Sequence, residues 1–250
     1  MDRSQLLALL DAVRSGTVAP ADAAKQIGAL PFAEAATAIV IDHQRELRTG
    51  VPELVYGQSK TAEQIAAAMR ELGKSGAALA TRVDADKAAR VHELVPAVTV
   101  HELARIVTFG ERPARPACAP ICVVCAGTSD LPVAEEAALV AEFLGAPVTR
   151  IADVGVSGLH RLLARIDDIR AAEVVIAVAG MEAALPSVLG GLIDRPLIAV
   201  PTSVGYGVSI DGLVALGALL AGCAPGVTVV NIDNGVGAAV AAVKIARLIK

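Results

Sequence analysis

The chain has 250 residues, of which 54% are hydrophobic and 2% aromatic, and its formal net charge is −4 at pH 7. This length suits one or two domains with sizeable cores, and the high apolar content argues against disorder. The negative charge and the scarcity of aromatic side chains argue against nucleic acid or an anionic membrane as a partner.

Residues 1–112 predict a small α/β domain at the N-terminus. Apolar residues at helical spacing alternate here with short apolar runs that are typical of strands. In chain order, the predicted elements are helices at 3–15 and 20–30, strands at 35–45 and 52–57, a helix at 61–72 and a strand at 76–83.

A Pro-rich, charged stretch at 111–116 (ERPARP) predicts a linker, and a second domain is expected over residues 120–250. In this domain, buried-strand patterns alternate with helical segments, one of which begins near Pro132 and ends before Gly145. The predicted strands are 121–127, 147–154, 173–180, 195–201 and 226–232. The predicted helices are 131–145, 157–170, 182–191, 211–222 and 235–250.

Five strands that alternate with helices predict an open, doubly wound parallel sheet of the α/β class. Ligands bind such sheets in the crevice outside the carboxyl ends of the strands. The loops at those ends consist of small or polar residues, and we expect the ligand there. These loops are 127–130, 153–157, 180–182, 202–207 and 231–235.

The sequence predicts a cytoplasmic protein. Residues 1–16 contain acidic side chains and lack the apolar core of a signal peptide. The longest uncharged run, 212–232, has the length of a bilayer span, but Ala224-Pro225-Gly226 divides it into a predicted helix, turn and strand. Four cysteines without a secretory context indicate a reducing compartment.

Cys118, Cys122 and Cys125 have the CxxxCxxC spacing of some iron–sulfur enzymes. Cys122 and Cys125 lie in a predicted strand, however, and an offset of three residues puts them on opposite faces, whereas cluster ligands must converge. We therefore expect no iron–sulfur cluster. Cys223 follows an apolar helix and has flexible neighbours, so it is either a reactive thiol or a buried core cysteine.

The segment Gly127-Thr128-Ser129-Asp130 joins the first strand of the second domain to its helix. Hydroxyls and free N–H groups at a helix N-terminus suit a phosphate, and an ordinary N-cap is the alternative. The loop lacks both GxGxxG and a Walker sequence, so neither a standard dinucleotide site nor an ATP site is indicated. No flavin is expected either.

Two further sets of polar residues could carry chemistry. Asp42, Arg45 and Arg48 recur at intervals of three and are followed by Lys60. Arginine forks suit phosphate or carboxylate groups, and a solvated surface is the alternative. His160 follows a predicted strand and could shuttle protons, or it could sit on the surface of a helix.

Residues 127–163, GTSDLPVAEEAALVAEFLGAPVTRIADVGVSGLHRLL, resemble the aminoimidazole ribonucleotide (AIR) carboxylase family, PurE. That family has a Gly/Ser-Asp phosphate loop and a later Ser-x-His-Arg stretch. The stretch here runs from Ser157 to Arg161 with the histidine displaced by one residue, which puts a direct transfer of its proton role in doubt.

Four blocks in the right order resemble LarB, the carboxylase/hydrolase of nickel-pincer nucleotide biosynthesis. They are DHQRELRTGVPELVYGQSKT (42–61), AGMEAALPSVLGGL (179–192), PTSVGYG (201–207) and AGCAPGVTVVNIDNG (221–235). The resemblance implies a PurE-like second domain that assembles as an octamer.

The same resemblance implies a reaction. CO2 carboxylates the pyridinium ring of nicotinic acid adenine dinucleotide, and the phosphoanhydride is hydrolysed, which gives pyridinium-3,5-biscarboxylic acid mononucleotide and AMP. The pyridinium ring is too electron-poor to attack CO2. A thiolate added beside the target carbon would turn it into a neutral, enamine-like ring that can do so.

By this resemblance, Cys223 is the expected nucleophile and Glu182 a candidate for the base that removes the ring proton, with His160 as a further catalytic candidate. Tyr206, in a Gly-flanked loop, is the candidate for stacking on a substrate ring. The other expected roles are phosphate binding by Gly127, Thr128, Ser129 and Asp130, binding of anionic groups by Asp42, Arg45, Arg48 and Lys60, and binding of a divalent cation such as Mg²⁺ by Asp233.

Two alternatives remain open. A purine-pathway carboxylase or mutase acting on an aminoimidazole ribonucleotide would need no cysteine. A non-catalytic nucleotide-binding module would bind the dinucleotide without releasing AMP.

Overall fold

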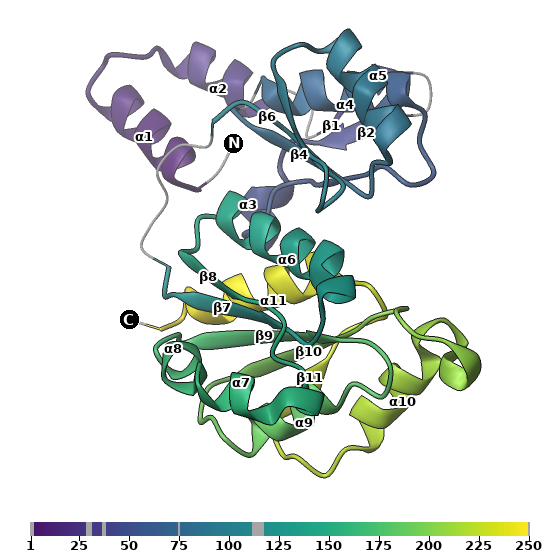
Figure 1. Ribbon diagram of the computed structural model, residues 1–250. Helices are drawn as coiled ribbons and strands as arrows, with labels where there is room; N and C mark the ends of the chain where they lie inside the picture. The colour runs from purple at the N-terminus through teal and green to yellow at the C-terminus, as the bar shows by residue number, and fades with distance from the viewer. Residues whose placement is uncertain (1–2, 29–31, 37–38, 75, 112–117, 250) are drawn as a thin grey trace. The chain divides into compact units, whose positions relative to one another are not determined.

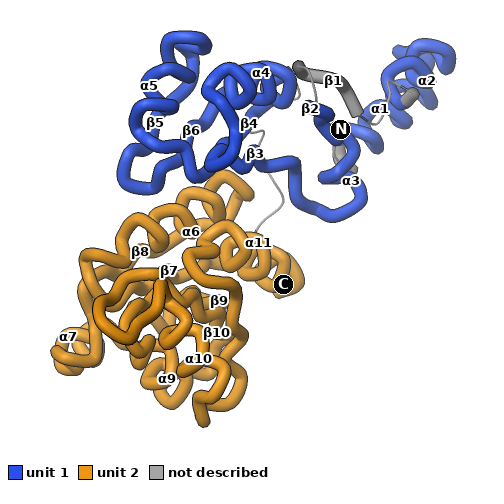
Figure 2. Tube along the Cα trace, turned by 90° about the vertical axis from the view of Figure 1, so that its right-hand side faces the viewer, with its two compact units in different colours: residues 1–113 blue, residues 114–250 orange. Residues whose placement is uncertain are grey.

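The computed structural model describes residues 3–28, 32–36, 39–74, 76–111 and 118–249. The chain forms two compact units, unit 1 over residues 1–113 and unit 2 over residues 114–250 (Figure 2). Apart from Glu111, the predicted linker lies outside the described residues. Each unit has its own sheet and core, so each is described by itself.

Unit 2 is built on a five-stranded sheet in which all strands are parallel, as the sequence predicts. In chain order the strands are β7 (Ile121–Cys125), β8 (Val148–Ile151), β9 (Val174–Ala179), β10 (Leu197–Pro201) and β11 (Val227–Val229). Their spatial order is β11-β10-β9-β7-β8. The chain leaves β7 for β8 on one side and then crosses to β9 on the other, so the topological switch point lies between β7 and β9.

Helices cover both faces of this sheet (Figure 1). On one face, α6 (Leu131–Phe143) packs against α11 (Gly235–Ala246). The other face is covered by α7 (Leu159–Leu163), α8 (Ile166–Arg170), α9 (Ala184–Gly190) and α10 (Leu213–Ala221), whose apolar side chains form one core cluster with Cys122 and Val124. All six residues of β9 are buried, which explains its continuous apolar sequence.

Two predicted helices of unit 2 begin or end differently in the structure. The helix expected at 157–170 is divided into a 3₁₀ turn at Val156–Gly158, then α7 and α8. Arg165 leaves the helical conformation, and Asp167 and Asp168 fall in the first turn of α8, where carboxylates are favourable. The helix expected at 211–222 begins at Leu213, after a 3₁₀ segment at Gly207–Gly212.

The long uncharged run divides as expected, since α10, a turn and β11 succeed one another within it. No helix among the described residues is long and apolar enough to cross a membrane.

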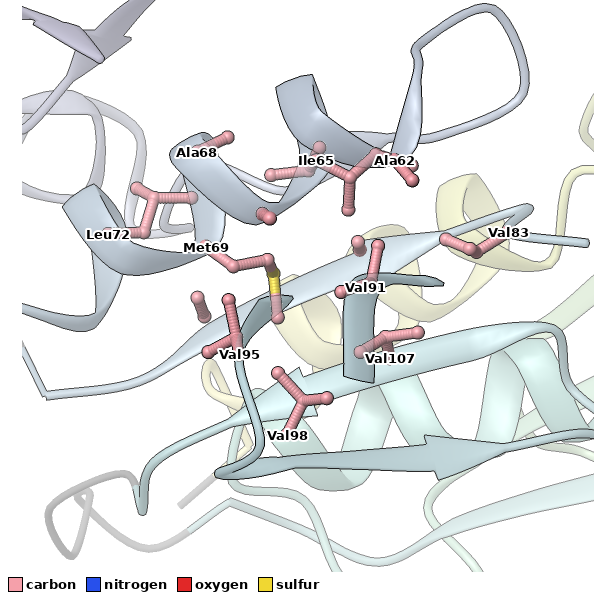
Figure 3. Packing of buried hydrophobic residues seen from close by; sticks show 14 of the residues in the cluster. Ala62, Ile65, Ala68, Met69, Leu72, Val83, Val91, Val95, Val98 and Val107 are labelled. Atoms are coloured by element: carbon pink, nitrogen blue, oxygen red, sulfur yellow. The ribbon is translucent and has the colours of Figure 1, made fainter. Parts of the chain in front are cut away.

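Unit 1 contains a mixed four-stranded sheet of the order β3-β4-β6-β5. The strands β3 (Val55–Tyr56) and β4 (Ala78–Thr81) are parallel, whereas β6 (Ile106–Phe109) is antiparallel to both β4 and β5 (Val98–His101). The core lies between this sheet and the helices α4 (Ala62–Gly73) and α5 (Ala85–Leu94). Figure 3 shows Met69 pointing from α4 into this core, near Val91 and Val95.

The remaining elements of unit 1 precede β3 in the chain. They are α1 (Arg3–Arg14), α2 (Pro20–Gly28), the antiparallel pair β1 (Phe32–Ala36) and β2 (Ile39–Asp42), and α3 (Arg45–Thr49). The single strand predicted at 35–45 is therefore wrong, because the chain pairs with itself and then turns into a helix. Residues 84–109 carry no predicted element, whereas in the structure Asp84 caps α5, and β5 and β6 form a hairpin.

Candidate active site

A pocket of about 320 Å³ lies at the carboxyl edge of the sheet in unit 2. The loops after β7, β8, β9 and β10 all contribute to it, so it surrounds the switch point between β7 and β9. Polar groups reach it from three of these loops, as Ser129, Ser157 and Glu182. It is therefore the place in unit 2 where a small ligand would meet several convergent polar groups.

Asp130 holds three of these loops together. Its side chain is only 4% exposed, and its Oδ2 accepts a hydrogen bond from the Gly127 N–H (3.0 Å) while Thr202 Oγ1 donates to Oδ1 (2.7 Å). The Gly180 N–H donates to it as well. Burial raises the pKa of Asp130, and the hydrogen bonds from Thr202, Gly127 and Gly180 oppose that rise. Asp130 thus positions the pocket, and a phosphate would have to rely on the rest of the loop.

Gly180 allows the close approach that this arrangement needs. A Cβ at this position would lie 2.4 Å from the Val204 carbonyl oxygen and 2.6 Å from Thr202 Oγ1. The loop after β9 can therefore lie directly against the loop after β10 only because residue 180 has no side chain.

Backbone strain is concentrated at this edge of unit 2. Glu182 lies between Met181 (φ 54°) and Ala183 (φ 50°), two non-glycine residues in the left-handed region. Each such residue is unfavourable by roughly 1 kcal/mol or more, and such residues gather where a site fixes a side chain. The two strained neighbours fix the backbone at Glu182, which lines the pocket, where a carboxylate could act as a general base.

Cys223 lies at the opposite edge of the same sheet. It is exposed and belongs to the segment between α10 and β11, so it precedes its strand, whereas the pocket follows the strands. A Cβ on Gly190, at the end of α9, would lie 3.0 Å from the Ala224 Cβ, while Ala184, at the start of α9, lines the pocket. The seven residues of α9 span about 10 Å, so one chain does not bring Cys223 to the pocket.

Four other predicted residues of unit 2 lie near the carboxyl edge of the sheet but do not line the pocket. Thr128 is exposed beside Ser129, and His160 is exposed on α7. Tyr206 is 80% exposed and precedes the 3₁₀ segment. Asp233 (φ 56°) accepts a hydrogen bond from the Ser203 N–H through Oδ1 (2.8 Å), which ties the loop after β11 to the loop after β10.

The fit of these residues to a divalent cation is limited. Among the described residues, no three His, Cys, Asp or Glu side chains gather in a group that could hold a metal. Asp233 alone could serve a magnesium ion only if substrate phosphates and water supplied most of the ligands, which is common for Mg²⁺.

The other cysteines of unit 2 are less accessible than Cys223. Cys122 and Cys125 are fully buried in β7, and burial raises their pKa values to about 12 and about 11. Cys118 is half-buried, and burial raises its pKa too. A thiol that stays protonated is a poor nucleophile, so Cys223 is the best placed of the four to react.

Unit 1 contains a second polar pocket, of about 370 Å³, between β2, β3 and the start of α4. Lys60 lines it. Asp42 and Arg48 lie close by but bind each other, with Arg48 Nη2 donating to Asp42 Oδ2 at 2.6 Å, and this hydrogen bond lowers the pKa of Asp42. Arg45, on α3, adds to the positive charge around Asp42.

The sequence analysis missed Tyr56, which also lines this pocket. A signal for it exists, because Tyr56 ends a strand and precedes the loop Gly57-Gln58-Ser59-Lys60 that leads into a helix. Residues at the carboxyl end of a parallel strand are candidates for ligand binding in either unit.

Comparison with known proteins agrees with the division into two different sheets. Residues 33–111 match the LarB/PurE-like N-terminal domain, and residues 120–250 match the AIR carboxylase domain. The chain belongs to the LarB family. An uncharacterized protein of Methanocaldococcus jannaschii is 36% identical over 96% of this chain and 96% of its own length.

The PurE-like half of this LarB-family chain also has relatives with a named activity. The N5-carboxyaminoimidazole ribonucleotide mutase of Methanocaldococcus jannaschii is 35% identical over 51% of this chain and 79% of its own length. The enzyme of the same name from Pyrococcus horikoshii is 32% identical over 49% of this chain and 70% of its own length. The chain is thus a PurE-like carboxylase family member with a LarB-type N-terminal domain.

Proposed function

We propose that this chain carboxylates the pyridinium ring of nicotinic acid adenine dinucleotide with CO2 and hydrolyses the phosphoanhydride. The products are pyridinium-3,5-biscarboxylic acid mononucleotide and AMP. The observation that carries the proposal is the contrast among the cysteines, since Cys223 is exposed while Cys122 and Cys125 are buried with raised pKa values. An AIR carboxylase-type reaction needs no thiol, whereas carboxylation of a pyridinium does.

The Cys223 thiolate bonds to the ring carbon beside the target carbon, and the electron pair of the ring double bond neutralises the ring nitrogen. The enamine carbon then attacks CO2, which forms the new C–C bond and restores the iminium. Glu182 takes the proton from that carbon, and the C–S bond breaks to return the thiolate and the aromatic ring. Water then displaces AMP at phosphorus.

This chemistry needs Cys223 and Glu182 at one ring, although one chain holds them at opposite edges of its sheet. We therefore infer that the pocket of one copy receives Cys223 from another, which fits the octamer that the family resemblance implies. The surface of α10 supports this arrangement. The helix has no charged residue, and Leu213 and Leu220 are exposed on it, as expected of a face that a second copy covers.

The other assignments follow from position. The N–H and hydroxyl groups of Gly127, Thr128 and Ser129 would hold the mononucleotide phosphate, and Asp130 would keep that loop in place. Asp233 would hold a divalent cation beside the pyrophosphate, and the cation would withdraw negative charge from the phosphate oxygens. His160 and Tyr206 lie outside the pocket of their own chain and would act only with another copy present.

The test is incubation of the Cys223→Ala variant with nicotinic acid adenine dinucleotide and ¹⁴C-bicarbonate. We expect the wild type to incorporate label and to release AMP, and the variant to lose label incorporation by a factor of at least about 10³. The half-buried Cys118, changed to alanine, is the matched control and should keep its activity. Undiminished incorporation by Cys223→Ala would overturn the proposal.

A second candidate function is supported by the two mutases that resemble the PurE-like half. On this view the chain would convert an N5-carboxyaminoimidazole ribonucleotide. Turnover of that substrate by both the wild type and Cys223→Ala, without any reaction of the dinucleotide, would favour it.

A further inference from the structure

The pocket of unit 1 that contains Lys60 has a well-defined aromatic wall. Tyr56 Oη donates a hydrogen bond to Gln58 Oε1 (2.5 Å), and the Arg82 guanidinium lies over the ring, 5.7 Å from its centroid. Tyr56 is nevertheless 46% exposed. The ring is therefore fixed in orientation, backed by a cation and still accessible, which is the arrangement that a stacking partner needs.

Arg82 itself is held in a strained conformation. It follows β4 directly and has a left-handed backbone (φ 54°), and the N–H of the next residue, Val83, donates to the Arg105 carbonyl oxygen at 3.0 Å. Because β3 and β4 are parallel, Tyr56 and Arg82 emerge at the same edge of the sheet. Strain of this kind in an ordered loop favours a role in positioning a side chain.

The polar groups of this pocket complement a nucleotide. Lys60 is half-buried in the wall, and among the described residues its ammonium group has no ion-pair partner. Glu53 Oε2 accepts a hydrogen bond from the Asp42 N–H (2.6 Å), which fixes that carboxylate. A fixed ring, a cation and a carboxylate that can accept hydroxyl groups together match a base, a phosphate and a ribose.

We propose that this pocket binds adenylate, with adenine stacked on Tyr56, the phosphate on Lys60 and the ribose hydroxyls on Glu53. Adenylate is chosen because the proposed function releases it, so the identity of the base rests on that function. The same chemistry could come from free AMP or from the AMP half of the dinucleotide. The pocket volume of about 370 Å³ is in the range of small-ligand sites.

The experiment is isothermal titration of the full-length protein with AMP and, separately, with the dinucleotide. We expect Tyr56→Ala to weaken AMP binding about tenfold or more, and Tyr56→Phe to stay within about twofold of the wild type because the ring remains. Lys60→Ala should weaken AMP but not adenosine. Binding of AMP only as part of the dinucleotide would identify the substrate half as the source, and binding of free AMP the product.

The control uses another cavity of unit 1. A larger cavity of about 750 Å³ lies between α5 and β5, with mostly aliphatic walls and with His92 in its lining. His92→Ala should leave AMP binding unchanged. If neither ligand binds the wild type, if Tyr56→Ala and Lys60→Ala bind like the wild type, or if His92→Ala loses binding instead, the proposal is overturned.

Failure of this site and failure of the proposed function give different results. Tyr56-dependent AMP binding in a protein that incorporates no bicarbonate would keep the site and reject the carboxylation. If the protein carboxylates the dinucleotide but Tyr56→Ala and Lys60→Ala bind AMP like the wild type, the carboxylation is kept and the site is rejected. Thermal unfolding of each variant, followed by circular dichroism, ensures that lost binding is compared only between folded proteins.

Discussion

The two edges of the sheet in unit 2 differ in almost every respect. Left-handed non-glycine residues, which are Asp153, Met181, Ala183, Ile210, Asp211 and Asp233 among the described residues, all belong to loops at the carboxyl edge. That edge also holds the pocket and the buried Asp130. The amino edge presents Cys223 on a short exposed segment.

This difference shows how the work of the proposed reaction can be divided. The carboxyl edge is strained and fixed in position, as a site that orients a substrate should be. A nucleophile needs only to be exposed and deprotonated at the right place, and a simple segment can present it to another copy. In the proposed reaction, the two edges would therefore be complementary halves of a site that a second copy completes.

Mixing experiments test most directly whether the two edges act from different copies of the chain. Cys223→Ala and Glu182→Gln should each be inactive, with losses of at least about 10²-fold. If the two residues act from different copies, oligomers that are dissociated, mixed in equal amounts and reassembled should regain about a quarter of the wild-type activity, because about a quarter of the sites would receive one intact residue from each copy.

The same two variants remixed with themselves are the controls. A double variant that carries both changes in one chain is mixed with wild-type protein to check the fraction of sites that receive both intact residues on random reassembly. No recovery in the mixture of single variants would mean that both groups serve a ring from one chain, which would contradict the geometry of the two edges.

The cysteines allow the edges to be compared without substrate. Cys125 ends β7 at the carboxyl edge, and burial raises its pKa to about 11. Cys122 lies near the start of the same strand, and burial raises its pKa to about 12. At pH 7.5 we expect iodoacetamide to modify Cys223 at least about 100-fold faster than either. Intact-mass and peptide mass spectrometry measure this, with urea-unfolded protein as the control. Equal rates in the folded protein would contradict the burial.

How far the sequence predicts this molecule depends on which kind of interaction fixes each part. The parallel sheet of unit 2 follows from local patterns, because buried strands such as β9 must be continuously apolar and helices must separate them. The pocket loops follow as well, since strand ends are known once strands are. The role of Asp130 does not, because two of its three partners, Gly180 and Thr202, come from loops that are far from it in sequence.

Unit 1 was less predictable for a related reason. Its strands have two to five residues and pair in mixed directions, so they give little periodic signal. Tyr56 belongs to a strand of only two residues, and no pattern in the neighbouring sequence predicts that Arg82 lies over its ring. Cys223 is the opposite case. Its place between the predicted helix at 211–222 and the predicted strand at 226–232 puts it at the amino edge of the sheet, whereas its role as nucleophile comes from the family resemblance and stays a prediction.

Asp130→Ala would show how much the carboxyl edge depends on one buried carboxylate. The change leaves the Gly127 and Gly180 N–H groups and the Thr202 hydroxyl without their acceptor, so we expect a loss of about 2–4 kcal/mol in the free energy of unfolding. Thr202→Val, which removes one donor and leaves the carboxylate with two, should lose only about 1 kcal/mol. Urea unfolding measures both. A smaller loss for Asp130→Ala than for Thr202→Val would contradict the central position of Asp130.

The smallest expected effect contrasts Asp130 with Asp42, the half-buried carboxylate that pairs with Arg48 in unit 1. The hydrogen bond from Arg48 lowers the pKa of Asp42, so the pair stabilises the folded state above the ordinary pKa of an aspartate and loses this contribution as the pH falls through the lowered pKa. Because Arg48 is exposed, Arg48→Ala should lower the midpoint temperature at pH 7 by no more than about 3 °C, and the difference should vanish once the pH is below the lowered pKa of Asp42.

The contribution of Asp130 to stability should depend on pH in the opposite direction. Its pKa is raised by burial, so the folded state holds the proton more tightly than the unfolded state does, and the contribution of Asp130 to stability falls as the pH rises through its folded pKa. The stability of the wild type relative to Asp130→Asn should therefore decrease as the pH rises from the ordinary pKa of an aspartate through the raised pKa of Asp130. The stability of the wild type relative to Arg48→Ala should instead increase, at lower pH, between the lowered pKa of Asp42 and its ordinary pKa. Parallel pH profiles for the two variants would show that both carboxylates are governed by charge pairing alone, which would remove the physical distinction between a buried positioning carboxylate and a solvated ion pair.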